Sequence, residues 1–220
     1  MDSLLLYDEL KGNMPIKSSQ PPNQAIDALQ AGATRLRSVP GTEVTEPRPL
    51  SLTRNVVQQG DAGVPHQVFH LSLDDVLAGK GVSEARATGW RFLLGQQSTH
   101  NGTVADVHGG GVAFEFGGLH HGPQAVKMIE VLQQAERLPG VRDGDFEPRL
   151  LRVPSLYVDA IWLKERRTGQ DLIIPIPPSL PPLVVGQQYS APDFEAVLKQ
   201  EAAARKPAPS PPGTSAPAAP

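Results

Sequence analysis

The chain of 220 residues contains no cysteine, which excludes disulfides, thiolate metal ligands and a thiol nucleophile. It also lacks any apolar run near the roughly 20 residues that span a membrane. Its first residues have neither the basic start nor the long apolar core of a signal peptide. The net charge is −3 with no long run of one sign, so neither nucleic acid nor an anionic membrane is expected as the main partner. We therefore expect a cytoplasmic protein without membrane or nucleic-acid contacts.

Proline and glycine are abundant, with 23 and 21 residues, and their distribution divides the chain. Residues 206–220 are rich in proline and alanine and predict a disordered tail. Residues 39–65 predict a linker or an outer strand, and residues 1–38 an N-terminal arm with short helical segments. Residues 66–205 are then expected to form a single α+β domain.

The spacing of apolar residues predicts an α+β fold, with a mainly antiparallel sheet of about six to seven strands and helices packed on it. The clearest strand starts at Leu156 and is apolar on both faces, as expected for a strand covered on both sides. A second strand follows from Leu172. Its Pro175 and Pro177 cannot donate to a neighbouring strand, so the sequence predicts that this strand forms an edge.

Helices are predicted from their starts and their apolar stripes. Ser72 and Asp75 have the spacing of a capping box for a short helix that Gly79 ends. Pro123 suits the first position of one helix, and Ser190 with Asp193 has the spacing of a capping box for the last helix. In the arm, a further helix begins near Asn23 and has apolar residues at helical spacing as far as Leu36. It could dock on a partner or pack on the protein's own core, and the second alternative is favoured because amphipathic helices usually face a core.

Asp159 is the only charge inside the central strand. A buried carboxylate must be paired, and Arg149 or Arg152 on the preceding strand is the expected partner. The alternative is an acid whose pKa is raised in a pocket.

The segment 103–116 predicts a hairpin. A two-residue turn at Gly109-Gly110 would pair Val107 with Val112 and put the apolar side chains on one face. Asp106, His108 and Glu115 would then share the other face. Two carboxylates and an imidazole suit acid–base chemistry or a weak metal site, although polar residues are also ordinary on an outer face.

The strongest candidates for a ligand site are His108, His120, His121 and Gly122. The glycine-rich run 117–122 ends a strand and opens a helix, so backbone donors, the positive helix end and imidazoles could meet an anion such as phosphate or carboxylate. The run lacks the patterns of nucleotide-binding loops, and its glycines could simply permit a turn. No metal ligands are predicted, because among the six histidines only His66 and His70 have the i, i+4 spacing of a known metal motif, and they are expected on a strand. No cofactor and no catalytic residues are predicted either.

The leading functional hypothesis from the sequence is a non-enzymatic protein-interaction or adaptor module, with the arm or the sheet edge contacting another protein. The alternative is a small-molecule or anion-binding protein, or an enzyme, with its site in the segment 108–123. Both hypotheses remain open at the level of the sequence.

Overall fold

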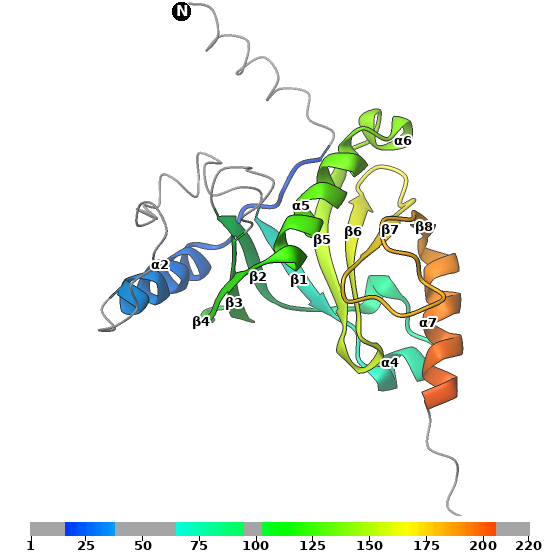
Figure 1. The fold of residues 1–220 in the computed structure, drawn as a ribbon, viewed down its shortest axis with the longest axis horizontal. Helices are drawn as coiled ribbons and strands as arrows, with labels where there is room; N and C mark the ends of the chain where they lie inside the picture. The colour runs from blue at the N-terminus through cyan, green and yellow to red at the C-terminus, as the bar shows by residue number, and fades with distance from the viewer. Residues whose placement is uncertain (1–15, 38–64, 95–102, 206–220) are drawn as a thin grey trace, which may run out of the picture.

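The computed structural model describes residues 16–37, 65–94 and 103–205, and it has the α+β fold that the sequence predicts (Figure 1). The predictions for the start of the arm, for nearly all of the linker and for the C-terminal tail lie outside these residues.

Eight strands form one sheet in the order β4-β3-β2-β1-β5-β6-β7-β8. All neighbouring strands are antiparallel except β1 and β5, which are parallel. The strands are β1 (His66–His70), β2 (Arg86–Leu94), β3 (Thr103–Gly110), β4 (Ala113–His121), β5 (Phe146–Val153), β6 (Val158–Glu165), β7 (Leu172–Ile176) and β8 (Tyr189–Ser190). The predicted count was slightly low because the two residues of β8 are too few to show an alternating pattern.

The sheet consists of two meanders that start side by side at its centre. From β1 the chain runs outward through β2, β3 and β4, and from β5 it runs outward through β6, β7 and β8 in the opposite direction. Because β1 and β5 are parallel, their carboxyl ends lie together at one end of the sheet. A rotation of 180° about an axis parallel to β1 and β5 would place one meander on the other. The same rotation would exchange the two faces of the sheet.

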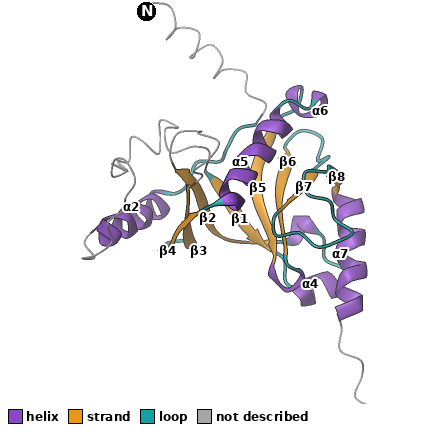
Figure 2. Ribbon diagram, in the orientation of Figure 1, coloured by secondary structure: helices purple, strands orange, loops and turns teal. Residues whose placement is uncertain are grey.

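Helices cover both faces of the sheet (Figure 2). The face in contact with α5 (Pro123–Glu136) is called face A, and α2, α4 and α7 lie on the opposite face B. The helical elements on or beside face B are α2 (Asn23–Arg37), α4 (Leu73–Leu77), η1 (Val82–Glu84), η2 (Pro154–Leu156) and α7 (Ala191–Arg205), and α6 (Pro139–Arg142) follows α5. The two longest helices that follow a meander, α5 and α7, thus lie on opposite faces.

The predicted helix starts are confirmed. Pro123 is the first residue of α5, after Gly122 at the N-cap. Ser190 accepts a hydrogen bond from the backbone N–H of Asp193 at 3.2 Å and so begins α7 as a capping residue.

Helix α2 packs on the protein's own core, as the sequence favoured. Ala25, Ile26 and Leu29 are fully or almost fully buried against β2 and β3. Further along the helix, Gly32 lies so close to the ring of Phe116 that a Cβ atom would collide with it. The absence of a side chain at Gly32 therefore sets how closely α2 approaches β4.

Two strand predictions need correction. The strand expected from Leu156 begins at Val158, because Pro154 starts a 3₁₀ turn and Tyr157 adopts a left-handed conformation with φ 55°. Strand β7 is not the edge of the sheet, because β8 pairs with Leu172 and Ile173. Its one proline, Pro175, is tolerated because β8 pairs only with Leu172 and Ile173, and Pro177 lies beyond the end of the strand.

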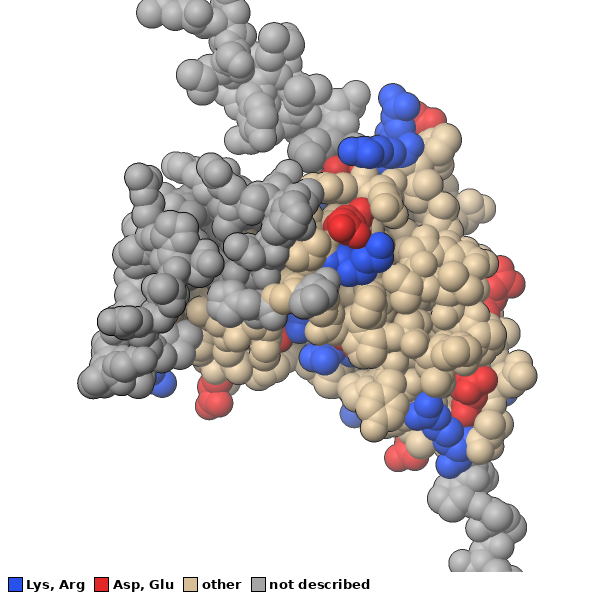
Figure 3. All heavy atoms as spheres, in the orientation of Figure 1, with Lys and Arg blue, Asp and Glu red and all other residues tan. Residues whose placement is uncertain are grey.

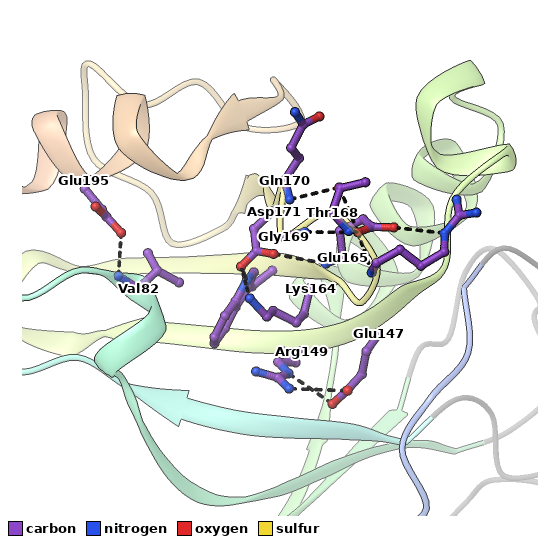
Figure 4. Close-up of polar contacts among 12 residues, drawn as sticks. Val82, Glu147, Arg149, Lys164, Glu165, Thr168, Gly169, Gln170, Asp171 and Glu195 are labelled. Atoms are coloured by element: carbon purple, nitrogen blue, oxygen red, sulfur yellow. Dashed lines mark hydrogen bonds and ion pairs between the residues drawn. The ribbon is translucent and has the colours of Figure 1, made fainter.

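Buried carboxylates hold the loop between β6 and β7 (Figure 4). Glu165 accepts hydrogen bonds from the backbone N–H groups of Arg167, Thr168 and Gly169 and from the Thr168 hydroxyl. These bonds, led by those from Thr168, lower the pKa of Glu165 to about 2. Asp171 accepts from the indole N–H of Trp162 at 2.8 Å and ties the loop to the core.

The contact at Gly32 can be tested by adding a methyl group. We expect Gly32→Ala to lower the free energy of unfolding by about 1–3 kcal/mol, because the methyl group overpacks the interface between α2 and Phe116. Gly140→Ala in α6 is the matched control, since a Cβ there meets no atom within 4 Å, and its effect should stay within about 0.5 kcal/mol. Chemical denaturation of both variants measures the difference, and equal effects would contradict the close packing of α2.

Candidate functional site

Ionisable side chains gather on the part of face A that lies beside the apolar core under α5. Five of them are two residues from a core residue of their own strand, so strand alternation puts them on the same face. His108 lies two residues from Asp106, and His120 pairs with the core residue Val104 on the neighbouring strand. Arg91 follows this rule with Leu93, for example, and Asp159 with Ile161. The members of this polar cluster are His70, Arg91, Asp106, His108, His120, Arg152 and Asp159.

The cluster is centred on the carboxyl ends of β1 and β5. His70 is the last residue of β1 and pairs with Arg152 near the end of β5. Arg152 in turn pairs with Asp159 on β6. One row of the sheet thus carries an imidazole, a guanidinium and a carboxylate side by side.

Arg91 and Asp106 form a buried bidentate ion pair. The Arg91 Nε and Nη2 atoms donate to the two carboxylate oxygens at 2.7 and 2.8 Å. Burial alone would raise the pKa of Asp106, but the hydrogen bonds and charge of Arg91 outweigh burial and lower it. Both carboxylate oxygens of Asp106 therefore accept a hydrogen bond from Arg91, and Oδ2 also lies 3.4 Å from His120 Nε2.

A β-bulge in β4 brings His120 to this face. His108 pairs with Glu115 and Asp106 pairs with Gly118, so Gly117 is an extra residue on β4. Without the bulge, strand alternation would put His120 and Glu115 on opposite faces. Glycine suits this position because a Cβ atom at Gly117 would collide with the imidazole of His108.

The predicted register of the hairpin is wrong, but its faces are right. Val107 pairs with Phe116 rather than with Val112, and the turn lies at Gly111 and Val112. The three successive glycines tolerate a turn at more than one position, and Gly111 supplies the left-handed conformation with φ 63°. The observed register differs from the predicted one by four residues. Because this number is even, His108 and Glu115 still share a face with Asp106.

The predicted ion pair of Asp159 forms with Arg152. Arg152 Nε donates to Asp159 Oδ1 at 3.2 Å, whereas Asp159 Oδ2 is buried without a hydrogen-bond partner among the described residues. Burial raises the pKa of Asp159, and the charge of Arg152 offsets this only in part. Arg149, the other predicted partner, lies on face B, where it stacks on Trp162 and binds Glu147 (Figure 4).

Arg152 and His70 retain unused hydrogen-bonding groups. In the described part of the chain Arg152 bonds only through Nε, so both of its terminal amino groups are without a protein acceptor. His70 is half-buried, and its pKa is lowered mainly by burial and further by the charge of Arg152, while Asp159 acts in the opposite direction. The row therefore combines an available cation with a neutral imidazole at neutral pH.

These groups border a hollow of about 80 Å³ on face A. Its lining residues include Val68, His70, Thr88, Asp106, His108 and Arg152. Sites for drug-sized ligands usually measure about 300–1,000 Å³, so the hollow suits a small ion or the end group of a larger molecule. Figure 3 shows basic side-chain atoms at the surface below the position of α5, between the two halves of the molecule.

The structure separates the four residues that the sequence singled out. His108 lines the hollow and His120 contacts Asp106 at its margin. Gly122 is the N-cap of α5 and is not part of the lining, and His121 ends β4 with a side chain outside the described atoms. Sequence analysis missed His70 and Arg152 as site residues, because only the parallel pairing of β1 with β5 brings them together.

Within residues 16–37, 65–94 and 103–205, no three His, Asp or Glu side chains are placed to hold a metal ion. Among the helices described, none has the length and apolar composition needed to cross a membrane. No protein-family model matches the chain, and no curated protein or solved structure matches it significantly.

The environment of Asp159 predicts a pH-dependent effect of Asp159→Asn. The folded-state pKa lies above the ordinary value of 3.8, so wild-type stability is expected to fall as the pH rises from 3.8 through the folded-state pKa. The variant does not titrate there. Its stability relative to wild type should therefore be greater at about pH 7 than at about pH 4. Urea denaturation at both pH values measures this difference, and a constant or opposite difference would show that Arg152 outweighs burial.

Proposed function

We propose that the protein binds a small oxyanion, either a phosphate or a carboxylate group, in the hollow at the carboxyl ends of β1 and β5. The observation that supports this proposal most is the state of Arg152. Its terminal amino groups have no acceptor among the described residues, and the residue lines the hollow. A planar guanidinium with two free amino groups matches the geometry of two oxygens of one oxyanion.

The surrounding imidazoles favour an anion over a cation. With neutral histidines, the two arginines of the cluster balance Asp106 and Asp159. Protonation of His70 would add positive charge beside Arg152. The charge of Asp106 is already neutralised by Arg91, which donates to both of its oxygens, so Asp106 attracts a cation weakly.

The position of the hollow also supports a binding role. In open sheets, ligands bind where neighbouring parallel strands end and the chain leaves in opposite directions. Here β1 leads into β2 on one side and β5 leads into β6 on the other, directly at His70 and Arg152. Side chains from both meanders are therefore held on a rigid sheet around one small volume.

The proposal predicts that Arg152 is required for binding. We would compare Asp159→Asn with the double variant Arg152→Gln/Asp159→Asn, so that no unpaired carboxylate stays buried when the guanidinium is removed. Phosphate and acetate should raise the melting temperature of wild type and of Asp159→Asn, but not of the double variant. A ligand at about 100 times its dissociation constant stabilises by about 2.7 kcal/mol, which thermal unfolding detects readily.

Arg142→Gln is the matched control for the change of charge. Arg142 is exposed at the end of α6, away from the hollow, and its removal should leave the thermal shift unchanged. The absence of a shift in wild type with either anion would overturn the proposal, and a shift that persists in the double variant would place the site elsewhere.

A protein partner is the second candidate, and one observation favours it. Strand β4 ends the sheet within the described residues, and a groove of about 380 Å³ lies between it and α2. The groove is lined by Ala28, Ala31, Gly32, Arg35, Phe114, Glu115 and Phe116. An extended, mainly apolar segment of another protein would fit beside the edge strand and contact the two phenylalanines.

Site-directed photo-crosslinking tests the second candidate. A benzophenone side chain introduced at Ala31, which is exposed in the groove, should form a discrete adduct with a partner protein in cells. The same side chain at Val112 is the control, because Val112 is 85% exposed at the hairpin turn and lies outside the groove. Identical adducts from both positions, or crosslinks only within the chain itself, would contradict this candidate.

A further inference from the structure

The hollow beside Arg152 is lined by side chains that come from separate strands. Arg152 belongs to β5, His70 to β1 and His108 to β3. In the row of the sheet that contains Val68 and His108, the residue of β2 between them is Gly89. Because Gly89 has no side chain, this row leaves open space between the strands that carry the two imidazoles.

Each of these three side chains can donate a hydrogen bond to a bound oxyanion. Both terminal amino groups of Arg152 are without an acceptor in the described part of the chain. An imidazole carries one N–H group when it is neutral and two when it is protonated, so His70 and His108 are donors in either state. Donors from β1, β3 and β5 therefore border one small volume.

The positive charges of these groups act together on His70. Its pKa is lowered mainly by burial, and the charges of Arg152 and His108 lower it further, whereas Asp159 raises it. An anion among the three side chains would offset this repulsion and stabilise the protonated imidazole. Binding of an anion and protonation of His70 are therefore coupled.

The other charged groups around the hollow are already bound or lie outside its lining. Asp106 also lines it, and Arg91 donates to both oxygens of this carboxylate. Arg86 pairs with the last residue of β1, but its guanidinium lies 3.5 Å from the carboxylate of Asp75. Glu115 on β4 is not among the lining residues. The guanidinium and the two imidazoles are therefore the charged or ionisable groups of the lining that an anion can bind.

We propose that the hollow binds a tetrahedral phosphoryl group, with Arg152 as the donor on one side and His70 and His108 as donors on the others. This inference rests on the proposed oxyanion site, and it names a phosphoryl group rather than a carboxylate as the ligand. A carboxylate has two oxygens in one plane, and one guanidinium binds both of them. A tetrahedral anion has further oxygens that point away from this plane, so it can use the imidazoles as well.

Isothermal titration of the full chain with four anions at neutral pH tests this inference. Inorganic phosphate and sulfate are tetrahedral, whereas acetate is a planar carboxylate. Oxalate carries two charges on planar carboxylate groups and so controls for charge. Wild type should bind phosphate and sulfate at least about tenfold more tightly than acetate or oxalate, because one added hydrogen bond to a charged group accounts for a factor of this size.

Substitution of His108 separates its contribution from that of Arg152. The side chain is exposed, so His108→Ala should leave the fold intact. Phosphate should bind this variant at least about tenfold more weakly, while the affinity for acetate stays unchanged. His108→Gln keeps an N–H donor and should restore part of the phosphate affinity. His120→Ala is the matched control, because His120 lies on the same face but outside the lining, and it should bind all four anions as wild type does.

The coupling to His70 gives a second readout that does not depend on a variant. Saturating phosphate should raise the pKa of His70, because a bound anion favours the imidazolium. NMR titration of the imidazole ring protons with and without phosphate measures this change, and His120 serves as the internal reference. An unchanged pKa of His70, or an equal rise at His120, would overturn the contact between the anion and His70.

The outcomes distinguish this inference from the proposed function. If none of the four anions binds wild type, the oxyanion site itself is wrong. If acetate or oxalate binds as tightly as phosphate, or if His108→Ala weakens all four anions alike, the site stands but the selection of a tetrahedral group is wrong.

A phosphomonoester such as phosphoserine identifies the source of the phosphoryl group. It keeps three phosphoryl oxygens for the three side chains, and its ester oxygen has to point out of the hollow. Binding at least as tight as that of inorganic phosphate would support the end group of a larger molecule as the ligand. Binding of inorganic phosphate alone would support the free anion.

Discussion

The parallel pairing of β1 with β5 is the contact on which the rest of the sheet depends. It is the only parallel pair in the described sheet, and it joins two meanders that otherwise have separate strand networks. The two central strands are also buried on both faces of the sheet. Val68 and Leu150 lie in the core under α5 on face A, and Phe69 and Leu151 lie in the core on face B. To form this pair, the long stretch of chain between β1 and β5 has to be closed into a loop, which costs chain entropy. The hydrophobic core that the pair completes offsets this cost.

The same pairing determines where charge is buried. On face A the apolar residues next to α5 give way to Arg91, Asp106, Arg152 and Asp159 within two residues along each strand. Buried ion pairs contribute little net stability compared with apolar residues of similar size. Here the ion pairs hold side chains in position, because each arginine is bound by a carboxylate on a neighbouring strand. The two pairs differ in the number of bonds: Arg91 donates from Nε and Nη2 to Asp106, whereas Arg152 donates to Asp159 only from Nε.

Much of the local structure was predictable from residue patterns. Helix starts at Pro123 and Ser190 follow from capping preferences, and the pair between Arg152 and Asp159 follows from adjacent strands with an unpaired charge. The faces of the hairpin were predictable although its register was not, because alternation has a period of two and glycines obscure the position of the turn. The assembly of the hollow was not predictable. His70 and Arg152 meet through a long-range parallel pairing, and residue spacing contains no signal for such a contact.

The bulge at Gly117 shows that the length of a strand can determine the chemistry of a face. His120 shares a face with Asp106 only because of the extra residue that precedes it on β4. Loss of one residue from this stretch would turn the His120 imidazole to the opposite face without altering the histidine content of the strand. A chain of the same fold with a contiguous pair of histidines but no bulge would therefore keep the composition of this site and change its geometry.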